Sequence, residues 1–236
     1  MQRAVAQRGV YEEIEKTCCW SRRLARLPSF CSTYRTINPC FRWGGEPFDE
    51  GEVDGDRIVN DSRKRLNNDV DPGLPAMTWE RFWQLVEVFG GEADTETCKR
   101  FEEACARLTE ILSREPVGQI IGFGERLAEA LHRLDRADFG TLPVLGMERP
   151  DGSPFPQSDD SFLYSRAAVV AAGRQAYESV FGHPERFVPF TALQCEELLY
   201  VHEEAFEQVA GTEWDRLTLY DYESCSNKDG WPKLSG

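Results

Sequence analysis

The stretch of sequence that decides the fold is residues 157–187, QSDDSFLYSRAAVVAAGRQAYESVFGHPERF. Ser158 and Asp159 are residue types that cap helix N-termini, and two adjacent acids in a first turn suit the helix dipole. Apolar side chains follow at helical spacing until a Gly-His-Pro sequence ends the pattern. The stretch predicts a helix, interrupted at Gly173, that forms the structural centre and lies beside any functional site.

Apolar residues recur at helical spacing in four further segments. These patterns predict helices over about 77–89, 95–113, 116–134 and 191–209. Residues 137–157 contain four Pro and three Gly and therefore predict a loop. The one short β-like pattern is LTLYDY, residues 217–222, in the tail. The sequence thus predicts an all-α bundle of five or six helices with an irregular C-terminal segment.

The charge is distributed unevenly along the 236 residues. The chain has 27 Lys and Arg against 41 Asp and Glu, a net charge of −14. Residues 1–76 hold 12 basic and 12 acidic side chains, whereas residues 77–236 hold 15 and 29. Apolar residues within 1–76 also recur at neither helical nor strand spacing. This predicts either that the segment is a disordered extension or that the gene start was placed upstream of a true start at Met77. Residues 77–236 are then one acidic, all-helical domain.

Several function classes are disfavoured by composition and motifs. A net charge of −14 argues against binding to nucleic acid or to an anionic membrane. No signal-peptide or membrane-spanning pattern is present, which predicts a cytoplasmic protein whose eight cysteines are reduced thiols. The sequence has no C-x-x-C, no P-loop, no G-x-S-x-G and no dinucleotide fingerprint. We therefore expect no metal and no cofactor.

The first group of candidate site residues lies on the central helix. It consists of Asp159, Asp160, Arg166, Arg174 and Tyr177. The two carboxylates are explained by helix capping alone, or by a polar groove that they line together with the arginines. Helical spacing places both arginines on one face of a continuous helix, where both meet acidic partners. Tyr177 is expected to be buried. Replacement of Arg174 with Met is expected to destabilise the fold because it leaves carboxylates without a positively charged partner.

The second group lies in the tail, where Asn227 and Trp231 flank a turn. An exposed Trp and Asn at a Gly-Pro turn are typical of a loop tip that contacts a binding partner, but Trp231 can equally fill a gap between the helices. If the tail folds back, Asp221 and Glu223 become partners for the arginines. Trp231 would then cover apolar surface beside Gly173.

The chain resembles a bacterial family known as domain of unknown function 4240, over about residues 77–232. The resemblance rests on Phe82-Trp83, on Ser158-Asp159-Asp160-Ser161-Phe162, on Gly173-Arg174 with Tyr177, on Pro184, and on the tail around Gly230-Trp231-Pro232. Many members have a Trp-rich stretch before the Ser-Asp-Asp motif, where this chain has FGTLP. The resemblance implies an all-helical, bacterial, cytoplasmic domain, and it implies no activity.

Two functions of different classes follow as hypotheses. The first is a non-catalytic protein-binding or regulatory module, in an immunity-like role, whose acidity suits a basic protein partner. The second is a small-molecule enzyme that uses Asp159 and Asp160 with Arg174, and it requires these side chains to converge in one pocket.

Overall fold

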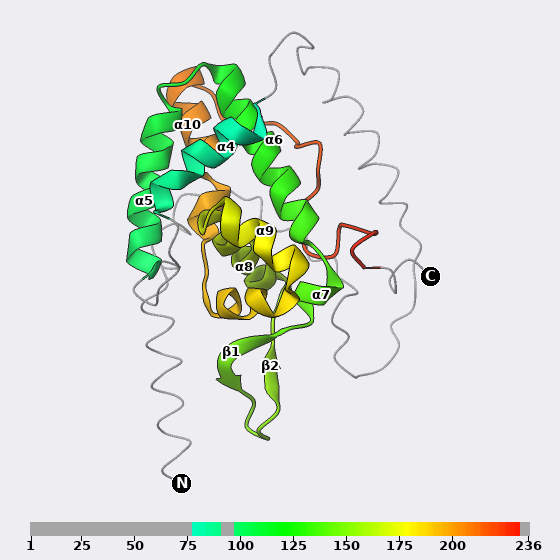
Figure 1. The fold of residues 1–236 in the computed structure, drawn as a ribbon. Coiled ribbons are helices and arrows are strands. Elements are labelled where there is room, and N and C mark those ends of the chain that lie inside the picture. The colour runs from blue at the N-terminus through cyan, green and yellow to red at the C-terminus, as the bar shows by residue number, and fades with distance from the viewer. Residues whose placement is uncertain (1–76, 91–96, 232–236) are drawn as a thin grey trace, which may run out of the picture. The chain divides into compact units, whose positions relative to one another are not determined.

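The computed structural model describes residues 77–90 and 97–231 (Figure 1). Both ranges lie in one compact unit, Trp43–Gly236. The predicted disordered or misplaced extension, residues 1–76, lies outside the described residues, as does the expected start of the second helix. Met77 is 2% exposed, and the Arg126 side chain donates a hydrogen bond to its carbonyl oxygen. Residue 77 is therefore part of the core.

The first half of the described chain forms the helices that the sequence predicts. They are α4 (Trp79–Val86), the short 3₁₀ helix η2 (Glu87–Phe89), α5 (Thr97–Leu112) and α6 (Val117–Leu134). Thr78 caps α4 because its side chain accepts a hydrogen bond from the Arg81 N–H. The apolar face of α4 packs its aromatic rings against one another and against Phe123 of α6.

Residues 137–157 are not a simple loop, which corrects the prediction. They form a short helix, α7 (Ala137–Gly140), and a hairpin of antiparallel strands, β1 (Pro143–Glu148) and β2 (Pro154–Pro156). β1 packs against η3 (Pro184–Ala192), where the Leu145 N–H donates to the Thr191 hydroxyl at 2.9 Å. The hairpin is thus held by a contact to a segment distant in sequence, which local patterning does not reveal.

The central stretch forms two helices, α8 (Asp159–Ala171) and α9 (Arg174–Gly182). Ser158 and Ser161 form a reciprocal capping box at the start of α8. Gly173 separates the helices because it adopts φ +90°, a left-handed value that L side chains rarely adopt. A Cβ at this position would meet nothing within 4 Å, so the glycine serves the backbone turn rather than close helix packing.

Residues 191–209 do not form one helix. η3 continues to Ala192, a second 3₁₀ helix, η4, spans Glu196–Leu199, and α10 spans Val201–Ala210. Pro189 inside η3 prevents regular α-helical hydrogen bonding there. Residues 211–231 contain neither helix nor strand, so the irregular C-terminal segment is confirmed and the β-like LTLYDY pattern is not a strand.

α8 is the structural centre, as predicted. Its residues 167–171 are at most 1% exposed, because it packs against α6, α9, η3 and η4. A helix that is buried on all sides has apolar residues all round, and this explains the run of small apolar residues in α8. The predicted burial of Phe162, Val169 and Tyr177 is confirmed at 2%, 0% and 6% exposure.

The described chain contains six α-helices of eight or more residues and one two-stranded sheet, which confirms the mainly helical fold class. None of the helices in these residues is both long and apolar enough to span a bilayer. Cys105 and Cys195 are buried free thiols.

Trp231 packs over Gly140, which gives a first testable prediction. A Cβ at Gly140 would lie 2.6 Å from Cη2 of Trp231 and 3.1 Å from Cε1 of Phe162. The change Gly140→Ala is therefore expected to displace the indole and to lower the free energy of unfolding by about 1–3 kcal/mol. Urea denaturation followed by circular dichroism measures the change. Gly182→Ala is the matched control because nothing lies within 4 Å of that position, and an equal effect of both changes would contradict the prediction.

Candidate functional site

Asp135, at the end of α6, holds the C-terminal tail. Its side chain is fully buried and accepts hydrogen bonds from the backbone N–H of Cys225 at 2.9 Å and of Asn227 at 2.8 Å. The indole N–H of Trp231 donates to the same carboxylate at 2.8 Å. We call Asp135 and residues 224–231 the tail clasp. Because all three N–H donors come from the tail, this one carboxylate fixes the path of the tail around it.

Arg166 of α8 is buried next to the tail clasp. Its guanidinium donates to the Leu131 carbonyl and to the Ser224 hydroxyl, both at 3.0 Å, and it lies over the Phe162 ring. Burial lowers the pKa of Arg166 to about 10, while the nearby Asp135 charge opposes that shift most strongly. Arg166 therefore remains charged at neutral pH, and Asp135 is its principal counter-charge.

The predicted tail residues face the interior of the protein. Trp231 is 7% exposed and fills a gap between Gly140 and Phe162, so it does not lie beside Gly173 as the sequence suggested. The side-chain amide of Asn227 donates to the His132 carbonyl at 3.0 Å. These contacts favour the packing explanation of the tail over an exposed recognition tip.

The two arginines of the first group are not on one face. Arg174 begins α9, is exposed, and pairs with Glu178 at 2.7 Å and with Glu80 of α4 at 3.4 Å, whereas Arg166 is buried in α8. The hydrogen bond to Glu178 is the largest cause of the raised pKa of Arg174. The structure removes the basis for the destabilisation expected of Arg174→Met, because Arg174 is exposed and exposed ion pairs contribute little to stability.

Asp159 and Asp160 do not converge with Arg174. Both acids lie in the first turn of α8, and Arg174 follows its last turn. Thirteen residues of α-helix rise by about 20 Å, so the carboxylates and Arg174 lie at opposite ends of α8. Tyr177 is buried as well, and its hydroxyl donates to the Ala130 carbonyl at 3.2 Å. The pocket required by the enzyme hypothesis is not formed by these residues.

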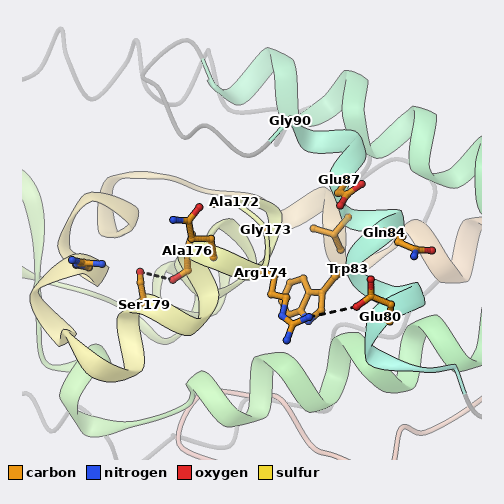
Figure 2. A pocket seen from close by; sticks show the side chains of 13 residues that line it. Glu80, Trp83, Gln84, Glu87, Gly90, Ala172, Gly173, Arg174, Ala176 and Ser179 are labelled. Carbon is orange, nitrogen blue, oxygen red and sulfur yellow. Dashed lines mark hydrogen bonds and ion pairs between the residues drawn. The ribbon is translucent and has the colours of Figure 1, made fainter.

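A groove of about 800 Å³ lies between α4 and the start of α9 (Figure 2). We call it the α4–α9 groove. Glu80, Gln84 and Glu87 line it from one side, at helical spacing on α4 and η2. Arg174 lines the other side at the start of α9, where no side chain caps the helix, and Arg186 of η3 also lines the groove. Sequence reasoning identified Arg174 but missed the α4 side, where the spacing of 80, 84 and 87 was the available signal.

Acidic and tyrosine side chains gather around η4 and the start of α10. We call this surface the acidic face, made of Asp160, Tyr164, Glu196, Tyr200, Glu203, Asp221 and Tyr222. The Tyr200 hydroxyl donates to Glu196 at 3.4 Å. Burial, followed by the charges of Glu196 and Asp160, raises the pKa of Tyr164, and burial with the charge of Glu203 raises that of Tyr222. These electrostatic couplings indicate that the acidic and tyrosine side chains of this face lie near one another.

Glu203 is the titrating group of the acidic face. Burial, followed by the like charges of Glu207 and Glu204, raises its pKa to about 7. The carboxyl group is therefore about half protonated at neutral pH. Later in the same acidic segment, Leu217 and Leu219 are 49% and 61% exposed.

Glu129 and His132, which form half of a di-iron motif, are engaged in other contacts. The Glu129 carboxylate is paired with Arg126 and Arg133, and His132 Nδ1 lies 2.6 Å from the Asp221 carbonyl. Within the residues that the structure describes, no three His, Cys, Asp or Glu side chains are grouped to hold a metal ion.

His202 gives a prediction for the pH dependence of stability. It is 2% exposed, and burial lowers its pKa from 6.5 to about 4. Between these two pH values the unfolded chain binds a proton at His202 that the folded chain does not. This contribution to stability is complete above pH 6.5 and is lost as the pH falls toward 4. Lowering the pH from 7 to 5 is expected to cost about 1–2 kcal/mol through this group.

Urea denaturation of His202→Gln at both pH values tests the prediction, because the variant should show a smaller pH difference than the unmodified chain. His183→Gln is the control, since His183 is exposed. Equal pH differences in all three proteins would show that His202 does not contribute.

Comparison with known proteins places the chain in a family. Residues 77–208, more than half of the sequence, match the family described as protein of unknown function (DUF4240). No curated protein and no solved structure matches the chain. The match includes α4 to most of α10, and therefore the α4–α9 groove and part of the acidic face, but not the tail that clasps Asp135. On this match over its helical domain, the chain belongs to the DUF4240 family.

Proposed function

We propose that the helical domain is a non-catalytic binding module that holds a basic segment of a partner protein on the acidic face, in a regulatory or immunity-like role. The observation that carries this proposal is the local charge. Residues 196–231 hold ten acidic side chains and two basic ones. Crowded like charges repel one another, and a positively charged partner relieves that repulsion while being steered toward the surface.

The composition of the acidic face suits a protein ligand. Tyrosines offer rigid rings with a polar end, and they are enriched where proteins bind other proteins. Tyr200 is 38% exposed and its hydroxyl donates to Glu196, and Leu217 and Leu219 are exposed in the same acidic segment. A Lys- or Arg-containing segment with a few apolar residues would find complementary charge and complementary apolar contact here.

Removal of charge from the acidic face tests the proposal. Fluorescence anisotropy measures binding of fluorescein-labelled decalysine to the full chain. The double change Glu196→Gln with Glu203→Gln is expected to weaken binding about tenfold, because two carboxylates near the bound lysines are lost. Binding is compared at pH 8, where the Glu203 carboxyl group is mostly charged. The matched control is Glu103→Gln with Glu110→Gln on α5, which removes nearly the same net charge from exposed residues elsewhere. Equal weakening by both pairs would show that only the overall charge attracts the peptide.

The pH dependence of binding provides a second readout of the same surface. The pKa of Glu203 is raised to about 7, so this carboxyl group loses its proton between pH 6 and pH 8. Lysine side chains keep their charge across that range. Binding of decalysine is therefore expected to strengthen from pH 6 to pH 8, and Glu203→Gln should remove most of this dependence. An unchanged pH dependence in Glu203→Gln would place the peptide elsewhere.

A further inference from the structure

The α4–α9 groove has charged side chains of opposite sign on its two sides. Glu80 and Glu87 lie on the α4 side, and Arg174 lies on the opposite side (Figure 2). Arg186 of η3 also lines the groove. Its volume of about 800 Å³ falls in the range of small-molecule sites. Gln84 and Gln175 add amide groups that both donate and accept hydrogen bonds. The groove therefore presents complementary charge to a molecule that is itself dipolar.

One ion pair spans the groove. The Arg174 guanidinium lies 3.4 Å from the Glu80 carboxylate, and the two side chains are 55% and 70% exposed. An exposed pair of this length contributes little to stability, so separating the two side chains has a small energetic cost. A ligand that carries both an ammonium and a carboxylate could replace this single contact with two.

We propose that the α4–α9 groove binds a small dipolar molecule, an amino acid or a short peptide, whose carboxylate pairs with Arg174 and whose ammonium pairs with Glu80. Arg174 offers a planar set of donors that matches a carboxylate in bidentate geometry. Trp83, which lines the groove, provides an apolar wall for the aliphatic part of the ligand. The groove shares no residue with the acidic face, so separate substitutions test the two proposals.

Isothermal titration calorimetry on the full chain tests the proposal with three probes: L-alanine, glycylglycine and glycyl-L-leucine. At least one of them is expected to bind with a Kd below 1 mM. Its N-acetylated form and its C-amidated form, which each lack one charge, are each expected to bind at least tenfold more weakly. If no probe shows saturable binding up to 10 mM, or if a capped form binds as tightly as the free one, the proposal is wrong.

Two variants locate the site. Arg174→Gln and Glu80→Gln each remove one exposed charge from the groove and are each expected to weaken the best probe at least tenfold. Glu110→Gln and Arg114→Gln are the matched controls, because they disrupt an exposed ion pair of 2.5 Å on α5 away from the groove. Retention of full affinity in both groove variants would overturn the assignment, and so would equal losses in the controls. Circular dichroism of each variant confirms that the fold is kept.

Discussion

Replacing Asp135 with Ala is expected to lower the free energy of unfolding by about 3–5 kcal/mol, because it leaves buried partners without their acceptor. The N–H groups of Cys225 and Asn227 and the indole N–H of Trp231 all donate to this carboxylate. The same carboxylate is the main counter-charge of the buried Arg166. Removing one partner of a buried charged network costs far more than removing an exposed charge.

Urea denaturation of the full chain at pH 7 measures this effect. A reductant keeps the cysteine thiols reduced in every protein compared. Asp138→Ala is the control. Asp138 lies three residues further on, pairs with Arg136 at 3.1 Å, and is 58% exposed in its side chain. The control is expected to change stability by less than about 0.5 kcal/mol. A decrease of less than 1 kcal/mol in the free energy of unfolding of Asp135→Ala would show that the contacts of the tail clasp contribute little to stability.

Truncating the chain after Ala210 is expected to have an effect at least as large, about 5 kcal/mol or more. The truncated chain retains the whole segment that matches the family, residues 77–208. It loses the burial of Trp231, and burial of a large apolar side chain contributes about 2–3 kcal/mol to stability. It also leaves the buried Asp135 and Arg166 without their partners in the tail. Because small domains are stable by only about 5–15 kcal/mol, the truncated chain should be largely unfolded or close to unfolding.

Circular dichroism and urea denaturation, again with reductant, measure the outcome. The full chain carrying Trp231→Ala is the companion variant, and it should lose part of the stability that the truncated chain loses. If the truncated chain unfolds at the same urea concentration as the full chain, the segment that matches the family would be stable without the tail. The contacts of Asp135 described above would then contribute nothing to stability.

The local sequence predicted the helices because local physics forms them. The capping residues of α4 and α8, the apolar spacing of α5 and α6, and the turn at Gly173 all depend on neighbours within a few residues. The same local signals failed where a distant contact determines the structure. The β1–β2 hairpin, for example, lies in a Pro-rich segment and is held by its packing on η3.

The candidate site shows the same division. By itself the sequence determined a mainly helical domain built around α8, because the spacing of apolar residues within one helix is visible in its own sequence. The sequence also showed that the acidic charge is concentrated after residue 76. The tertiary structure alone decided that Arg166 is buried and Arg174 exposed, and that Trp231 covers Gly140 rather than Gly173. It also brought Asp135 to Trp231, 96 residues further along the chain. Such pairings depend on how the elements pack against one another, and no local periodicity specifies which distant side chain will meet a buried charge.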